Sequence, residues 1–461
     1  MHIGKSILGN LLAGSLGRII NALTPLLLVP LMIRTWGLHQ YGEWLILTAI
    51  PGYIMLSSDF GLSGAVVNQL ARSTAEGKRT EAICLYRTTW LLLTLLGGIA
   101  ASLGMAGARL VTWKPLGVTL LAGAAPVILS WSLLQIFVGQ QQYLLTGIYR
   151  SARRNPRNGF VQSIGYAFYL IVGCVCLWFK AQPANFLALN VAARVVFLGV
   201  MLIDTRHIMP DFTLSLRGLS LRAVRPYVVP GLGHAALPLI NAFQNEAMVL
   251  VLGALLGPVS VAVFQTTRTA VNGAKSLTQL ASSSVLQEIP ALVGEGRMSV
   301  VRRLVVMNTQ ASLAGTLGWF CLLASFGSAI FHLWLHNSTV YSPPLVLLLL
   351  ASMFPFAVAN SYMIVLMATN QIHRAVVWLV LAGIGSLAVA AAGSVTLGLN
   401  GAAFGVIAFE ALNFLVVCRI AARYTDVHVR ESLESVFSLR SLGESYASAW
   451  QLLRTVPRRW A

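Results

Sequence analysis

Charged residues are scarce in this chain of 461 residues, and acidic residues are the scarcest. Only 10% of the residues are charged, and 14 aspartates and glutamates stand against 32 lysines and arginines, which gives a net charge of +18. Hydrophobic residues make up 57% of the chain, and the mean hydropathy is +0.75. A soluble domain of this length does not have such a composition. The sequence therefore excludes an ordinary soluble protein and points to a membrane protein.

Cysteine is also rare. The five cysteines fall in apolar runs expected to be helical, and Cys174 and Cys176 point in different directions on a helix. Such cysteines are typical of small core residues, and they do not form the spacing of a disulfide framework or a metal site. We therefore expect no disulfide, no metal site and no cofactor.

Long apolar runs recur from end to end, which is typical of membrane-spanning helices. The sequence predicts an all-α polytopic membrane protein with about twelve spans: 10–34, 41–68, 83–107, 117–140, 158–179, 185–205, 228–255, 259–285, 303–326, 343–369, 375–397 and 401–422. The first run is long and contains Arg18, so we expect it to remain as a span and not to be cleaved as a signal peptide.

The basic residues of the loops predict the orientation. If the N-terminus is cytoplasmic, most loop arginines and lysines lie on the cytoplasmic side, and the opposite side holds only Arg34, Arg109, Lys114 and Lys180. The positive-inside rule then places both termini of this multi-pass protein in the cytoplasm. This charge lies on short loops at a membrane surface, where it contacts membrane lipids, so we expect no nucleic-acid partner.

Weak internal similarity indicates a duplication. Residues 75–78 (AEGK) resemble residues 294–297 (GEGR), 219 positions later, and Gly37 corresponds to Gly257, 220 positions later. Six helices per repeat give both halves the same orientation. The sequence predicts two six-helix bundles related by a pseudo-two-fold axis along the membrane normal. We place the bundles at 1–205 and 228–422, with a cytoplasmic linker at 206–227 and a basic tail at 423–461 that is either an interfacial helix or has no role.

Several cations lie inside the predicted spans, where each costs roughly 2.5–3.5 kcal/mol on insertion scales. Arg18 shares a helix face with Asn21, and Arg268 shares one with Asn272 and Lys275. Such stripes, in helices at matching positions of two halves, point to a binding site in a central cavity. We therefore expect Arg18, Asn21, Arg268, Asn272 and Lys275 to hold an anion there.

Two further cations have more local interpretations. Arg87 lies one turn inside its predicted span, so it is expected to extend its side chain to the cytoplasmic surface. Arg194 either lines the cavity or pairs with Glu246 or Asp59. Both alternatives for Arg194 remain open on the sequence alone.

Acidic and histidine residues inside the spans are candidates for coupling transport to an ion gradient. Asp59, Glu246 and Glu410 can each carry a proton or serve as the fixed partner of a buried arginine. Structural pairing is favoured for Asp59 and Glu246, and Glu410 is open either way. His234 lies on a polar stripe and either titrates or is a satisfied core histidine.

One stretch resembles a known family. The segments WGLHQYGEWLIL (36–47), PGYIMLSSDFGLSGAVVNQLA (51–71) and AEGKRTEA (75–82) are similar to those of the Wzx-type polysaccharide or O-antigen flippases of the MOP superfamily. The resemblance rests on Gly37, Tyr41, Gly42, Trp44, Asp59, Gly61, Glu76 and Gly77. The second half repeats part of the pattern in QEIPALVGEGR (287–297).

This resemblance implies a lipopolysaccharide- or exopolysaccharide-related flippase of the bacterial inner membrane, and not an enzyme. Such proteins move a polyprenyl-diphosphate-linked oligosaccharide from the cytoplasmic to the periplasmic leaflet by alternating access, with H⁺ or Na⁺ as the coupling ion. Other polysaccharide-assembly proteins are further expected partners. The diphosphate would be the anion held by Arg18, Arg268 and Lys275.

Three alternatives compete with the flippase. A multidrug or metabolite cation antiporter of the same superfamily would favour acidic residues in its cavity, whereas cations outnumber acids in these spans. A membrane enzyme of glycan assembly, either a polymerase or a ligase, would need a large extracytoplasmic loop, and the longest one expected is about 327–342. A structural membrane protein is the third alternative.

Overall fold

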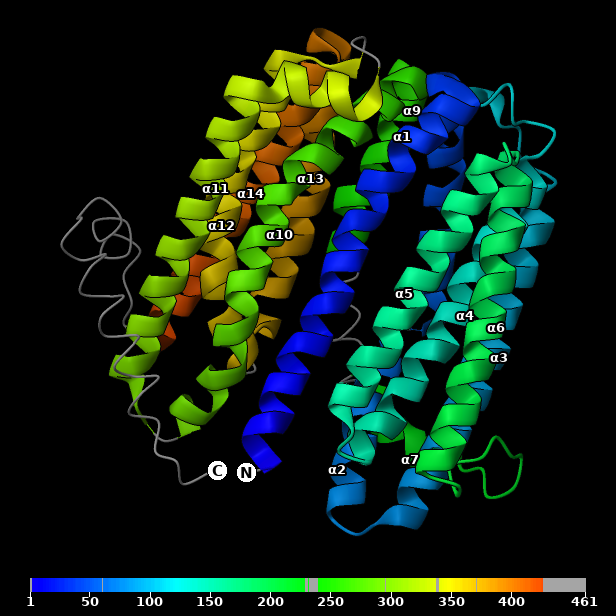
Figure 1. The fold of residues 1–461 in the computed structure, drawn as a ribbon, viewed down its shortest axis with the longest axis vertical. Helices are drawn as coiled ribbons and strands as arrows, with labels where there is room; N and C mark the ends of the chain where they lie inside the picture. Colours follow the sequence, from blue (N-terminus) through cyan, green and yellow to red (C-terminus); the bar gives the residue numbers. More distant parts are fainter. Residues whose placement is uncertain are drawn as a thin grey trace. The chain divides into compact units, whose positions relative to one another are not determined.

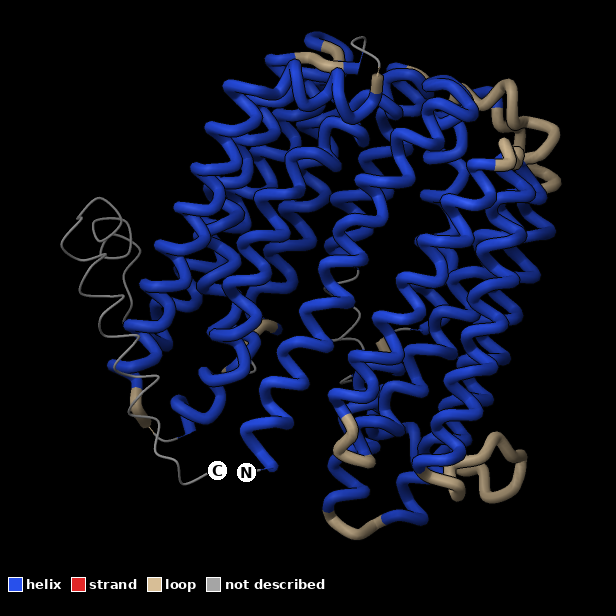
Figure 2. Tube along the Cα trace, viewed as in Figure 1, coloured by secondary structure: helices blue, strands red, loops and turns tan. Residues whose placement is uncertain are grey.

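The computed structural model describes residues 2–425 except 60, 229–230, 232–238, 295, 337–339 and 370. Every regular element within these residues is helical (Figures 1 and 2). Nine helices of the described part are long and apolar enough to cross a membrane. The expectation of an all-α, multi-pass membrane protein is therefore confirmed. His234 and the tail beyond residue 425 lie outside the described residues.

Residues 5–262 form one compact unit, here called the N-terminal unit. Its regular elements are α1 (His2–Asp59), α2 (Leu62–Ala75), α3 (Arg79–Ala108), η1 (Lys114–Leu116), α4 (Ala125–Ser151), α5 (Asn155–Trp178), α6 (Pro183–Ile208), α7 (Leu221–Val224), η2 (Arg225–Tyr227), η3 (Phe243–Ala247) and α9 (Met248–Leu256). Helix α4 packs against α2, α3 and α6, so it forms the centre of this unit.

Residues 263–461, with the first four residues of the chain, form a second compact unit, the C-terminal unit. Its described helices are α10 (Pro258–Gly294, which begins in the other unit), α11 (Met298–Leu335), α12 (Pro343–Ala368), α13 (His373–Leu397) and α14 (Leu399–Thr425). Helix α14 packs along α12 and α13, and α12 also packs on α11. The two compact units divide after residue 262, whereas the sequence places its linker at 206–227. The sequence-based boundaries remain a prediction.

The backbone repeats between the two halves of the chain. Gly37 kinks α1 at φ 79° and ψ 164°, and Gly257 has nearly the same angles, φ 80° and ψ 173°, before α10. Gly77 and Gly296, in the two matching loops, have φ 78° and 70°. Left-handed φ values also recur at the pairs Gly117 and His336, and Lys180 and Gly398. Non-glycine residues rarely adopt positive φ, so this pattern supports the duplication expected from the sequence.

The second predicted span, 41–68, is not one continuous helix. Helix α1 ends at Asp59 and α2 begins at Leu62, with Gly61 between them at φ 69°. The Asp59 carboxylate accepts hydrogen bonds from the Ser63 amide (2.9 Å) and the Ser63 hydroxyl (2.7 Å). Free amides at a helix start need such an acceptor. The aspartate and glycine of the family-like DFGL segment therefore build the junction between two helices.

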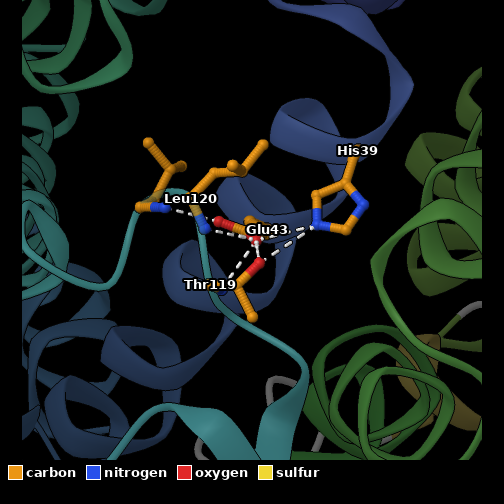
Figure 3. A network of polar contacts seen from close by, with 5 residues as sticks. His39, Glu43, Thr119 and Leu120 are labelled. Carbon is orange, nitrogen blue, oxygen red and sulfur yellow. Dashed lines mark hydrogen bonds and ion pairs between the residues drawn. The ribbon is translucent and has the colours of Figure 1, made fainter.

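The fourth predicted span, 117–140, begins later than expected, because α4 starts only at Ala125. The apolar segment before it is a loop held by Glu43, which lies on α1 and is fully buried. Its carboxylate accepts hydrogen bonds from the amides of Thr119 (2.7 Å), Leu120 (2.9 Å) and Leu121 (2.6 Å), and His39 contacts it at 3.0 Å (Figure 3). Because the Glu43 carboxylate accepts the hydrogen bonds of these amides, the segment can satisfy its backbone groups without forming a helix.

The loop between α2 and α3 carries exposed charge pairs. Glu76 accepts hydrogen bonds from Lys78 Nζ (2.9 Å) and Arg72 Nε (3.0 Å). These two bonds, the one from Lys78 first, lower the pKa of the Glu76 carboxyl. Exposed pairs of this kind contribute little to stability. The glutamate and glycine of the AEGK loop therefore shape a turn, with Gly77 supplying the positive φ.

Candidate functional site: a charged cluster in the C-terminal unit

The polar face of α10 is the strongest candidate site in the described residues. Arg268 and Lys275 are seven positions apart, which is almost two helical turns, so they lie on the same face. Asn272 lies between them, as the sequence predicts. Arg268 is 8% exposed although it carries a charge. A charge so far from water needs a compensating partner, and a transporter can use one to hold its cargo.

Helix α14 supplies an acidic partner. Glu410 is 4% exposed, and it interacts electrostatically with both Lys275 and Arg268. Asn413, one turn further along α14, donates a hydrogen bond to Glu410 Oε2 at 3.3 Å. The sequence leaves the role of Glu410 open, and the structure brings it to the two cations. We call Arg268, Lys275 and Glu410 the charged cluster, which carries one net positive charge when all three are ionised.

An aromatic side chain from α12 completes the surroundings of Lys275. Its Nζ lies 4.4 Å from the centroid of the Phe356 ring. A cation over a ring face is attracted by the quadrupole of the ring, by about 0.5–2 kcal/mol depending on solvent exposure, and Lys275 is partly buried. The lysine head group thus lies over an aromatic face and interacts electrostatically with the Glu410 carboxylate. Three helices, α10, α12 and α14, contribute to the site.

Helix α11 fixes the position of α10 at the same level. Trp319 donates an indole hydrogen bond to the Ala270 carbonyl at 3.1 Å. The indole lies so close to Gly273 that a methyl group there would overlap it. Only glycine allows this approach without displacing the tryptophan. Ala270 and Gly273 lie between Arg268 and Lys275 in the chain, so this contact supports the backbone that carries both cations.

A buried polar network joins α10, α11 and α12 two turns beyond Lys275. Asn308 donates hydrogen bonds to Ser282 Oγ (3.0 Å) and Ser361 Oγ (2.9 Å), and Asn360 donates to Ser282 Oγ (2.7 Å). These residues are absent from the sequence prediction, because serines and asparagines in apolar helices do not stand out as charges do. Their spacing from Lys275 on one helix face is the signal that could have found Ser282.

The N-terminal unit holds Arg194 differently. Its guanidinium lies 4.5 Å from the centroid of the Tyr169 ring, so α6 contacts α5 through a cation–π interaction. Gln142 of α4 donates hydrogen bonds to the Tyr169 hydroxyl (3.0 Å) and to the Arg194 carbonyl (2.9 Å). This arrangement ties three helices together. Whether Arg194 also lines a cavity or pairs with Glu246 or Asp59 remains a prediction.

The other site residues from the sequence are spread over the N-terminal unit. Asn21 is exposed on α1, and the side chain of Arg18 lies outside the described part. Glu246 lies in a π-helical turn, η3, where its side chain approaches Gly52 of α1 and interacts with Tyr53. Such turns occur frequently at functional sites. Whether Arg18 acts together with Arg268 and Lys275 remains a prediction.

Arg87 has a structural role about two turns after the start of α3. Its guanidinium donates hydrogen bonds to the Thr213 carbonyl (Nε, 3.0 Å) and to the Thr213 hydroxyl (Nη2, 2.9 Å). The sequence expects this arginine to reach a membrane surface. The structure shows it bound to the segment that follows α6, which the sequence predicts to be cytoplasmic, so the expectation stays a prediction.

Comparison of the structure with known structures identifies the fold. The chain is similar to an inward-facing multidrug resistance MATE family transporter of the MOP superfamily (TM-score 0.72, 14% identity, 87% of this chain and 94% of the other covered). It is also similar to the lipid II flippase MurJ in an inward closed conformation (TM-score 0.73, 10% identity, 96% and 93% covered).

The fold is that of MOP superfamily transporters. A MOP superfamily transporter from Pyrococcus furiosus, described as having a binding pocket of reversed polarity, is also similar (TM-score 0.63, 13% identity, 92% of this chain and 96% of the other covered). No family model and no curated protein matches the sequence. At these identities the similarity establishes the fold, and the cargo must be argued from the site.

Proposed function

We propose that this MOP-fold protein is a flippase for a polyprenyl-diphosphate-linked oligosaccharide. The cargo would move from the cytoplasmic to the opposite leaflet of the bacterial inner membrane by alternating access, with both termini cytoplasmic. The observation that supports this cargo is the charged cluster, in which Arg268 and Lys275 outnumber Glu410. A site with excess positive charge among apolar helices suits an anion and repels a cation.

The cluster suggests how the anion binds. With no cargo, the Glu410 carboxylate offsets the charges of Lys275 and Arg268. Diphosphate oxygens would compete with the carboxylate for the same cations. Arginine can bind two phosphate oxygens at once, whereas lysine acts as a point charge. Glu410 would therefore compensate part of the charge of the two cations in the empty transporter, and the diphosphate would do so when cargo is bound. The two cations would then never lack a negatively charged neighbour.

The sign of the charges limits the coupling. An H⁺ or Na⁺ bound at Glu410 would free the cations and strengthen anion binding, so it would travel with the cargo. An ion that moves inward in exchange for the cargo needs a different acid, and Glu246 beside Tyr53 is our candidate. The membrane potential also helps, because outward movement of an anion from a negative interior gains about 2.3 kcal/mol per charge per 100 mV.

The experiment compares single variants in cells that depend on this gene for surface polysaccharide. Arg268→Gln and Lys275→Gln should each lower the surface glycan by about tenfold or more, because each removes the excess positive charge, and a hydrogen bond to a charged group contributes about 1.5–3 kcal/mol. Arg419→Gln is the matched control, since this arginine lies exposed on α14. Protein levels in the membrane must be equal. Normal glycan in both cluster variants would contradict the proposal.

A multidrug or metabolite cation antiporter remains the alternative, because the MATE transporter has the same fold. Two glutamates, Glu246 and Glu410, could serve a cationic cargo. Dye-efflux measurements distinguish the two functions. An antiporter would expel cationic dyes and lose this activity in Glu410→Gln, whereas the flippase would expel none.

A further inference from the structure

The segment that follows α6 is fixed to one face of α3 in the N-terminal unit. The guanidinium of Arg87 on α3 donates hydrogen bonds to the backbone carbonyl and to the hydroxyl of Thr213. The Thr88 hydroxyl accepts a hydrogen bond from the Ser220 amide at 3.1 Å. Val224 of α7 is 2% exposed and belongs to the hydrophobic core of this unit. Helix α7 is therefore held in a defined position on α3, and its outward residues are presented in a fixed arrangement.

A cavity of about 310 Å³ lies between α3 and this segment. Its lining residues are Leu92, Leu221, Arg222, Val224, Arg225 and Val228. Arg222 and Arg225 are both exposed, and no hydrogen bond or ion pair among the described residues engages either guanidinium group. Two unpaired arginines over an apolar floor form a site for a molecule with an anionic head and an apolar body.

An apolar stripe runs along α3 from this cavity. Leu92, Leu96, Ile99 and Leu103 follow helical spacing on one face, and the last three are exposed. Leu96, Ile99 and Leu103 also line a second cavity of about 490 Å³, and the other residues that line it are apolar too. Eleven residues of helix separate Leu92 from Leu103, which is about 17 Å. One leaflet of a bilayer core is about 15 Å deep.

We propose that an anionic membrane phospholipid binds at this face of the N-terminal unit. Its phosphate would lie between Arg222 and Arg225, and one acyl chain would follow the stripe from Leu92 to Leu103. The length of the stripe matches an acyl chain of one leaflet, which favours a phospholipid over a much longer polyprenyl chain. Arg222 and Arg225 belong to the segment 206–227 that the loop charges place on the cytoplasmic side, where anionic lipids attract basic residues. The site is separate from the charged cluster and does not depend on the proposed cargo.

The experiment measures lipid binding to the purified full-length protein in a neutral detergent. The probes are phosphatidylglycerol, phosphatidylcholine, glycerol 3-phosphate as a head group without acyl chains, and a polyprenyl diphosphate. The double variant Arg222→Gln, Arg225→Gln should weaken phosphatidylglycerol binding by roughly 30-fold, about fivefold for each interfacial arginine. Arg217→Gln is the matched control, since Arg217 is exposed on the same segment and does not line the cavity. It should change binding less than twofold.

Each probe decides one part of the proposal. Phosphatidylglycerol should bind more tightly than phosphatidylcholine, and glycerol 3-phosphate should bind far more weakly than both. Equal binding of the two phospholipids, or unchanged binding in the double variant, would overturn the site. Tighter binding of polyprenyl diphosphate than of phosphatidylglycerol, lost in the double variant, would overturn the choice of ligand. The melting temperature of each variant separates lost binding from lost folding.

Discussion

Two buried glutamates of this chain have different neighbours, and the neighbours decide what each can do. The carboxylate of Glu43 accepts hydrogen bonds from three backbone amides of a loop, which fix its position. Glu410 instead interacts electrostatically with Lys275 and Arg268, and both cations could also attract another anion. The first residue is therefore structural, and the second belongs to the proposed transport site.

Removal of the Glu43 carboxylate should destabilise the protein. In Glu43→Ala the amides of Thr119, Leu120 and Leu121 lose their acceptor, at about 1–3 kcal/mol for each amide that remains buried. The melting temperature should fall clearly, while Glu81→Ala, which removes an exposed acid, should change it little. An unchanged melting temperature in Glu43→Ala would show that the loop does not depend on this carboxylate.

At the scale of elements, two glycines at matching positions shape the two halves. Gly37 and Gly257 both combine φ near 80° with an extended ψ, a region that essentially only glycine occupies. A methyl group at either position would meet no other atom within 4 Å, so only the backbone conformation requires glycine there. The kinks are thus a repeated device that turns the chain between two helices of each half.

The two kink glycines should respond alike to substitution. Gly37→Ala and Gly257→Ala should each cost about 1–3 kcal/mol, measured by chemical or thermal unfolding, because the strained conformation remains. Gly98→Ala is the control, since Gly98 lies inside α3 with open space around it, and the change there should be neutral or slightly stabilising. A large loss at only one of the two kinks would contradict their equivalence.

Most helices could be predicted from the sequence because apolar length is a strong signal. The breaks between helices could not be predicted. Asp59 and Gly61 interrupt one apolar run, and in another run the Glu43 carboxylate accepts hydrogen bonds from backbone amides, so that this segment forms a loop. The site was found in part. Charges in apolar helices revealed Arg268 and Lys275, but the approach of Glu410 and Phe356 depends on how α12 and α14 pack, which no local pattern encodes.

At the scale of the whole molecule, the two units share a backbone plan and differ in chemistry. The repeated glycines fit the duplication expected from the sequence. The cations inside the helices, however, have different neighbours in the two units. Arg194 packs on Tyr169 and joins helices in the N-terminal unit, whereas Arg268 and Lys275 interact electrostatically with Glu410 in the C-terminal unit. We expect anion recognition to depend more strongly on the C-terminal unit than on Arg194.

The central claim is that the charged cluster carries a lipid-linked diphosphate across the membrane. The most direct measurement is translocation of a polyprenyl-diphosphate-linked disaccharide in vesicles containing the purified protein, with the potential set by a potassium gradient. We predict transport that increases with a potential negative on the loading side and is lost in Lys275→Gln but not in Arg419→Gln. Transport of this substrate at the wild-type rate by Lys275→Gln, or of a cationic dye alone by the wild-type protein, would contradict the claim.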